Sequence, residues 1–184
     1  MNITAQLKIN PKICAANNGE SFFKAANGKS DVIFLLNGDI CDLKRNVLYA
    51  HDRGKKIFIH FDLANGLGKD ESAVKFVADF IKPDGIISTK TSIIRAAKQK
   101  GLMTVFRVFI IDSQGVKTAV SNIEKTDCDF VEVMPGVIPG VIKSFAKLNK
   151  KLIAGGLISS EEEVSAALNA GAIAVSTSCE NLLN

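Results

Sequence analysis

The chain has 184 residues, of which 47% are hydrophobic and 23% charged, and its net charge at pH 7 is +4. This length supports one well-buried core, so we expect a single domain over residues 1–184. The lysines are scattered rather than gathered into a run, which permits a polyanionic partner without indicating one. No apolar run is long enough to span a membrane, and the N-terminus lacks a signal peptide, so we expect a cytoplasmic protein.

The cysteines and histidines show neither the spacing of a metal centre nor that of a disulfide framework. A zinc site needs clustered His and Cys, whereas the only two histidines, His51 and His60, stand apart from the cysteines. The cysteines have no C-x-x-C spacing, as is typical of reduced thiols in the cytoplasm. We therefore expect no metal and no cofactor. The four cysteines are Cys14, Cys41, Cys128 and Cys179.

Short apolar runs recur eight times from residue 13 onward, and each ends in a polar residue or glycine. They predict buried strands at residues 13–17, 32–37, 57–62, 85–90, 103–108, 130–135, 152–156 and 173–178. Helix-periodic segments separate them, at residues 20–28, 41–54, 71–82, 92–101, 115–125, 137–149 and 161–171. Strict alternation without hairpin signals requires parallel strands with right-handed crossovers. Eight such units predict an α/β fold, a compact (β/α)8 barrel of the TIM type with short loops.

The end of the chain leaves little material for a helix after the eighth strand. Only the segment CENLLN, residues 179–184, follows that strand, so we expect a truncated last helix. The N-terminal arm, in which Pro11 would break a helix, could cover part of the outer surface of the first and last strands. An uncovered apolar patch usually marks an interface. We therefore expect a homo-oligomer in which a neighbouring chain packs near Leu182 and Leu183.

Polar residues gather at the carboxyl ends of the predicted strands, where barrel proteins place their sites. The set contains two carboxylates and two cations, which must be paired or bind a ligand if they are buried. One interpretation is a plug of mutual salt bridges, and the other is a set of polar contacts to a ligand. The candidate ligand contacts are Asn17, His60, Asp62, Lys90, Arg107 and Glu132.

Adjacent glycines, Gly155 and Gly156, stand where the seventh strand passes into a helix. They could simply relieve crowding in a tight connection, or their N–H groups could surround a phosphate. Barrels commonly hold a phosphate at the loops after strands seven and eight, and the loop after strand eight carries Ser176, Thr177 and Ser178. The short last helix would direct its positive end toward the anion. With carboxylates opposite to accept hydroxyl groups, we expect a glycerol-sized phosphorylated polyol. The nearby Ser160 and Glu163 form a capping box, which we interpret as structural.

Several stretches in combination resemble the glycerol uptake operon antiterminator regulatory proteins. They are HFDLANGLGKD, DGIISTK, VEVMPG, IAGGLIS, AGAIAVSTS and NGDICDL, and the resemblance runs nearly end to end. It implies a barrel that binds glycerol 3-phosphate and acts on the leader mRNA of a glycerol-use operon, so that transcription passes a terminator. Family members tend to carry Gln at the position of Phe106 and Lys at that of Gly140, so one cation is absent here.

Two functions from different classes therefore compete. The first is a regulator without catalytic turnover that responds to glycerol 3-phosphate. The second is a class I aldolase or isomerase acting on a triose-sized phosphate, with Lys90 as the Schiff-base lysine and Asp62 or Glu132 as acid and base. A metal-dependent variant of the enzyme would use His60, Asp62 and Glu132. The resemblance favours the regulator, with no catalytic residue.

Overall fold

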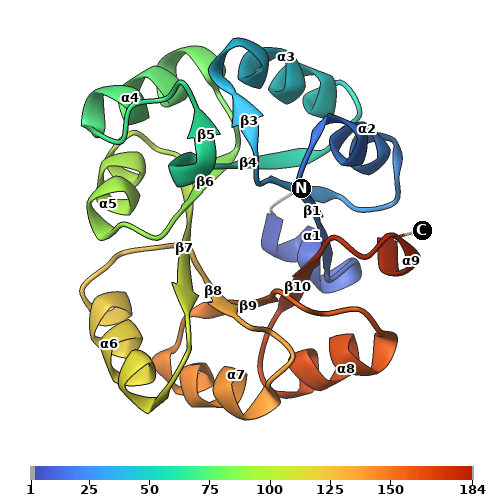
Figure 1. The fold of residues 1–184 in the computed structure, drawn as a ribbon, viewed down its shortest axis with the longest axis vertical. Coiled ribbons are helices and arrows are strands. Elements are labelled where there is room, and N and C mark those ends of the chain that lie inside the picture. The colour runs from blue at the N-terminus through green and yellow to red at the C-terminus, as the bar shows by residue number, and fades with distance from the viewer. Residues whose placement is uncertain (1–2, 184) are drawn as a thin grey trace.

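The computed structural model describes residues 3–183, which form a closed barrel of parallel strands inside a ring of helices (Figure 1). Each strand pairs with its neighbours in the order β1-β2-β4-β6-β7-β8-β9-β10, and β10 closes the barrel against β1. The barrel strands are β1 (Lys12–Ala16), β2 (Val32–Leu35), β4 (Lys56–His60), β6 (Gly85–Ser88), β7 (Met103–Phe109), β8 (Phe130–Met134), β9 (Lys151–Gly155) and β10 (Ala174–Thr177). The predicted (β/α)8 barrel is confirmed, with all eight predicted strands present to within two residues at each end.

Helices follow the strands as the sequence pattern predicts. They are α2 (Gly19–Asn27), α3 (Ile40–His51), α4 (Glu71–Phe76) with its π-helical extension η2 (Val77–Ile81), α5 (Thr91–Gln99), α6 (Ser113–Glu124), α7 (Pro139–Phe145) with the 3-10 turn η3 (Ala146–Leu148), α8 (Glu161–Asn169) and α9 (Glu180–Leu183). The Ser160 hydroxyl accepts the N–H of Glu163, whose carboxylate accepts the N–H of Ser160, so the predicted capping box is present. The acidic start of α8 thus stabilises its own helix terminus.

The barrel interior is a dry, close-packed cluster rather than a channel. Side chains from all eight strands meet there, including Phe34, Phe58, Val105 and Phe130. Gly85 makes room for the Phe58 ring, because a Cβ at this position would lie 2.4 Å from a ring carbon. The interior therefore pairs a large residue on one strand with glycine on the next.

An N-terminal helix, α1 (Ile3–Ile9), caps the barrel at the end where the strands begin. Its buried side chains Ile3 and Leu7 belong to the same cluster as the barrel interior, and Figure 1 shows it inside the ring of helices. The expected arm over the outer surface of the first and last strands is therefore wrong. Pro11 ends the helix rather than preventing it, because residues 3–9 lie before the proline.

Two aspartates fasten the same end of the barrel. Asp84, directly before β6, accepts the N–H of Ile57 at 2.9 Å and the Lys56 ammonium at 2.8 Å. Asp129, directly before β8, accepts the N–H and the hydroxyl of Thr104, each at 3.0 Å. Each carboxylate thus ties the start of one strand to its neighbour, a role in stability rather than in binding.

A small parallel sheet lies at the opposite end. It pairs β3 (Gly38–Asp39) with β5 (Ala64–Asn65), and the 3-10 turn η1 (Phe61–Leu63) precedes β5. The sequence pattern did not predict this pairing, although both segments belong to the stretches that resemble the antiterminator family. It occupies the β2 and β4 side of the barrel end, which leaves the β7 to β10 side for a cavity.

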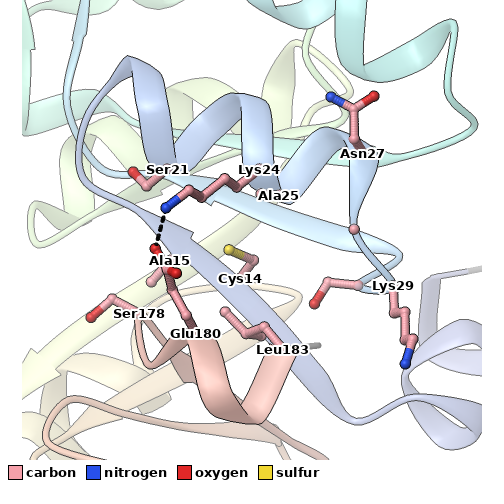
Figure 2. Close-up of a pocket in the computed structure, with 12 residues that line it drawn as sticks. Cys14, Ala15, Ser21, Lys24, Ala25, Asn27, Lys29, Ser178, Glu180 and Leu183 are labelled. Atoms are coloured by element: carbon pink, nitrogen blue, oxygen red, sulfur yellow. Dashed lines mark hydrogen bonds and ion pairs between the residues drawn. The ribbon is translucent and has the colours of Figure 1, made fainter.

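The truncated last helix leaves a groove on the outside of β1, between α2 and α9 (Figure 2). The groove encloses about 390 Å³, and an ion pair of 2.8 Å between Lys24 and Glu180 spans it. Leu182 is nevertheless only 5% exposed because its own chain covers it, so it is not the open contact that the sequence suggested. Burial and the nearby Glu180 carboxylate raise the pKa of the Cys14 thiol in this groove to about 11.

Candidate functional site

Side-chain alternation places a polar layer directly above the apolar interior. Residues two positions apart on a strand share a face, so the residue two after each interior side chain also points inward. Arg107 follows Val105, Glu132 follows Phe130, and Ser176 follows Ala174 in this way. All three are buried, Glu132 completely. The polar residues at the strand ends therefore converge on the barrel axis, as predicted.

A hydrogen-bonded network joins three of these groups. The Arg107 Nε–H donates to Glu132 Oε2 at 2.5 Å, and the Ser176 hydroxyl donates to Glu132 Oε1 at 2.5 Å. Arg107 and Glu132 are direct register partners on β7 and β8. The interpretation as a salt-bridged plug is therefore correct for this pair. Arginine carries five N–H donors, so one bond to Glu132 leaves others for a ligand.

A cavity of about 380 Å³ opens above this network, within the range of small-molecule sites. Seven predicted site residues line it: Asn17, Arg107, Glu132, Gly156, Ser176, Thr177 and Ser178. Sequence reasoning missed the other seven lining residues, which are mostly apolar: Ala15, Leu36, Met134, Leu157, Ile158, Ser159 and Cys179. The available signal was that each lies at or just after the carboxyl end of a strand, because this end of a barrel carries the site.

The two adjacent glycines have different roles. A Cβ at Gly155 would lie 2.5 Å from Glu132 Oε1 and 2.6 Å from the Ser176 hydroxyl, so this glycine makes room for the buried carboxylate. Gly155 lies beneath the cavity and does not line it. Gly156 has a φ of +81° and borders the cavity, as does Leu157 with a φ of +65°. At the end of β9, Gly155 therefore relieves crowding, whereas Gly156 allows the backbone to adopt a left-handed conformation.

Three hydroxyl residues lie at the end of β10, with Ser176 and Thr177 on the strand and Ser178 directly after it, and they differ in whether another residue already occupies them. Thr177 donates its hydroxyl to the carbonyl of Ile158 at 2.7 Å and accepts the N–H of Cys179 at 3.0 Å, which binds the two loops together. Ser176 is committed to Glu132. The exposed Ser178 borders both this cavity and the groove beside α9. It is therefore the one predicted hydroxyl of this loop that is not occupied by another described residue.

Three predicted ligand contacts lie outside the cavity lining. His60 is buried on β4, and its Nδ1 has no hydrogen-bond partner among residues 3–183. Burial, followed by the nearby Arg107 charge, lowers its pKa to about 4, so the imidazole is neutral at pH 7. Its place in the polar layer was predicted correctly, but the cavity opens beside β7 to β10 rather than β4.

Asp62 is occupied within its own part of the chain. Its carboxylate accepts the Ser88 hydroxyl at 2.8 Å and the N–H and hydroxyl of Thr89 at 2.7 and 2.9 Å. Burial acts to raise the pKa of Asp62, but these hydrogen bonds outweigh it and lower the pKa. The carboxylate therefore fixes the β6–α5 loop, because most of its acceptor capacity is used there.

Lys90 is exposed at the N-cap of α5. The interior residue of β6 is Ile87, and alternation places Lys90 with Ser88 on the other side of the backbone. A Schiff-base lysine instead sits desolvated in a pocket. The structure thus does not bring Lys90 to the cavity.

The described part of the chain contains neither a group of side chains suited to a metal ion nor a helix suited to a membrane. Within residues 3–183, no three His, Cys, Asp or Glu side chains are grouped so that they could hold a metal ion. This includes the set His60, Asp62 and Glu132. Over the same residues, no helix has the length and apolar character needed to cross a membrane.

Comparisons with known proteins agree over nearly the whole chain. Residues 12–183 match the family model described as glycerol-3-phosphate responsive antiterminator. A solved structure of a glycerol uptake operon antiterminator regulatory protein from Listeria monocytogenes is 38% identical, with a TM-score of 0.90 and 94% of each chain covered. An antiterminator-related protein from Thermotoga maritima is 37% identical, with a TM-score of 0.82, covering 93% of this chain and 96% of that one. Escherichia coli K12 protein YgcP is 36% identical over 93% of this chain and 90% of its own length.

Proposed function

Because the chain belongs to the family of glycerol-3-phosphate responsive antiterminators, we propose that it binds glycerol 3-phosphate in the cavity above Arg107 and regulates transcription. With the ligand bound, the protein would act on the leader mRNA of a glycerol-use operon so that transcription passes a terminator. The observation that carries the ligand assignment is the position of the cavity, which lies at the carboxyl ends of β7 to β10, between a buried arginine and two short loops. Phosphate sites in such barrels commonly lie at these loops.

The phosphate is assigned to the β9–α8 side of the cavity. Gly156 and Leu157 turn the backbone through positive φ there, which allows peptide N–H groups to face an anion. Ser178 supplies a hydroxyl from the facing loop, and Arg107 supplies the cationic side chain in the lining. Gly155, Ser176 and Thr177 support this site from below and from the side through the contacts described above.

The glycerol hydroxyls are assigned to the opposite wall. Asn17 borders the cavity from the end of β1, and the Glu132 carboxylate retains lone pairs beyond its two bonds. The other residues that line the cavity are mostly apolar. The size of the cavity suits a three-carbon ligand. Asp62, His60 and Lys90 lie outside the lining and are not assigned to the ligand.

A regulator without catalytic turnover fits both the family and the site. The competing aldolase function needs a desolvated lysine within reach of the ligand, whereas Lys90 is exposed on the other side of its strand. The family is one of regulatory antiterminators, and no catalytic residue is proposed.

Calorimetry tests the ligand assignment most directly. We expect glycerol 3-phosphate to bind, and glycerol to bind much more weakly. Gly156→Asp should abolish binding because its carboxylate would face the phosphate, whereas Asp62→Asn, outside the lining, should leave binding intact. Unchanged affinity in Gly156→Asp, in a protein with an unaltered circular dichroism spectrum, would place the ligand elsewhere. Read-through of a leader terminator in vitro, with and without glycerol 3-phosphate, tests the action on RNA.

We also propose that the protein is a homo-oligomer, with the groove between α2 and α9 at the contact. The groove is open on the outside of β1, and its lining includes Ala25 of α2 and Leu183 of α9. Leu182 is excluded as the contact because it is buried, which leaves the partly buried Leu183 and the walls of the groove.

A further inference from the structure

Charge is distributed unevenly between the two ends of the barrel. The helices begin at the end that holds the cavity, and most of them carry carboxylates in their first turn. These first-turn residues are Glu20, Asp42, Glu71, Glu161, Glu162, Glu163 and Glu180. Lysines at the cavity end are few, and Gly140 stands at this end of α7. The helix starts of α2, α3, α4, α8 and α9 at the cavity end therefore disfavour a polyanion, whereas α5, α6 and α7 have no carboxylate in their first turn.

The other end carries exposed lysines on six different elements. They are Lys8 of α1, Lys29 before β2, Lys82 before β6, Lys100 before β7, Lys125 before β8 and Lys147 of η3, and we call them the basic end surface. None of these six takes part in an ion pair with another residue in the range 3–183. Lysines near helix carboxyl ends also stabilise the helix dipoles. The six lysine side chains are nonetheless exposed to solvent, where a charged partner can reach them.

The carboxylates at this end offset part of that field, since Asp79, which pairs with Lys75, acts on Lys82 and Lys100, and the exposed Glu124 precedes Lys125. Asp84 and Asp129 are committed to Lys56 and Lys98 and to backbone N–H groups of the neighbouring strands. The α1 cap lies inside the ring of helices, and its Lys8 is exposed. The basic end surface thus combines α1 with connections that precede several barrel strands.

An exposed aromatic side chain accompanies these lysines. Phe80, two residues before Lys82, is 57% exposed and stacks on Phe76 with a centroid separation of 5.4 Å and an interplanar angle of 27°. Aromatic rings beside cations are the usual platform for unpaired bases. A membrane or an acidic protein would also be attracted to the lysines, but an exposed stacked ring beside them favours a nucleic acid.

From these observations we propose that RNA binds across the basic end surface, at the end of the barrel opposite the ligand cavity. This inference rests on the proposed antiterminator function, which supplies RNA as the partner, and it adds the location. The lysines contact phosphates, and Phe80 stacks on an unpaired base.

Two matched triple variants test the location. Lys82→Gln, Lys100→Gln and Lys125→Gln remove three positive charges from the basic end surface, at positions outside the groove between α2 and α9. Lys44→Gln, Lys117→Gln and Lys143→Gln remove three equally exposed lysines from helices around the barrel. A fluorescent random-sequence RNA of about 40 nucleotides is titrated with each protein at several salt concentrations, because phosphate contacts show themselves in the salt dependence.

We expect the first triple variant to bind RNA at least tenfold more weakly, with a salt slope smaller by about 2, at about 0.7 per lost contact. The control triple should stay within about twofold of the original protein, and calorimetry should give an unchanged glycerol 3-phosphate affinity for both. Phe80→Ala should weaken RNA binding without changing the slope.

The opposing outcomes are distinguishable. Equal losses in the two triples would mean that RNA responds only to net charge, which overturns the location while the antiterminator function stands. Failure of the unaltered protein to bind RNA, with or without glycerol 3-phosphate, would instead contradict the RNA part of the proposed function. Binding to phosphatidylserine vesicles but not to RNA, lost in the first triple only, would identify the surface as a membrane contact and overturn the proposal.

Discussion

Replacing Gly155 with alanine should destabilise the protein, because the added methyl group would displace the buried Glu132 carboxylate. The new Cβ would lie 2.5 Å from Glu132 Oε1 and 2.6 Å from the Ser176 hydroxyl, closer than any carbon can stay. The carboxylate would have to leave its place and give up its bonds to Arg107 and Ser176. A hydrogen bond to a charged group contributes about 1.5 to 3 kcal/mol, so we expect a loss of about 3 to 5 kcal/mol in the free energy of unfolding.

A double-mutant cycle separates this mechanism from a general effect of alanine. Glu132→Ala removes the carboxylate that the new Cβ would meet and releases the Ser176 hydroxyl, which can then rotate away from the Cβ. In that background Gly155→Ala should therefore cost less than about 1 kcal/mol. Gly156→Ala is the matched control. Its Cβ would meet only the flexible end of Met134, so its cost, about 1 to 2 kcal/mol from the positive φ, should not depend on Glu132.

Urea unfolding followed by circular dichroism measures the six proteins of this comparison, which include Gly156→Ala with and without Glu132→Ala. We expect a coupling free energy of at least about 2 kcal/mol between Gly155→Ala and Glu132→Ala. If their effects add to within about 0.5 kcal/mol, Gly155 is not making room for the carboxylate and the assignment of the two glycines fails.

Further predictions concern the rest of the molecule. Asp84→Asn should lower stability by about 1 to 3 kcal/mol at pH 7 in thermal or urea unfolding, whereas the exposed Asp52→Asn should change it little. Burial acts to raise the pKa of Asp84, but hydrogen bonds from Lys56, Ile57 and His51 outweigh it and lower the pKa below the unfolded value. The stability that Asp84 contributes is therefore complete above about pH 4 and is lost as the pH falls through the folded pKa, so a variant with the same acid profile as the original protein would contradict this role. Borohydride reduction with dihydroxyacetone phosphate should leave Lys90 unmodified in a peptide map, and an adduct there would revive the aldolase function. Sedimentation at micromolar concentration should show a homo-oligomer that Leu183→Glu dissociates, and a monomer at all concentrations would end that proposal.

The strand and helix pattern of this chain determined the fold class without tertiary information. Each buried strand is a short apolar run closed by a polar residue or glycine, and several helices carry a capping residue at their start, as at Ser160 and Glu163. Local periodicity is sufficient for this because side-chain alternation and helix capping depend on neighbours within a few residues. The same alternation placed Arg107, Glu132 and Ser176 on one inner face.

Only the tertiary structure decided which of these groups border the cavity. The sequence could not show that Glu132 is held by Arg107 and Ser176, that Asp62 is occupied by Ser88 and Thr89, or that Gly155 serves the carboxylate rather than a phosphate. Each of these depends on distances between strands that are far apart in the chain. The same holds for α1, whose two buried residues are too few to reveal from their spacing that they cap a barrel. The sequence pattern can predict that a polar group is buried. Which group it bonds to depends on the register between strands and on the closure of the barrel, and only the assembled barrel defines these.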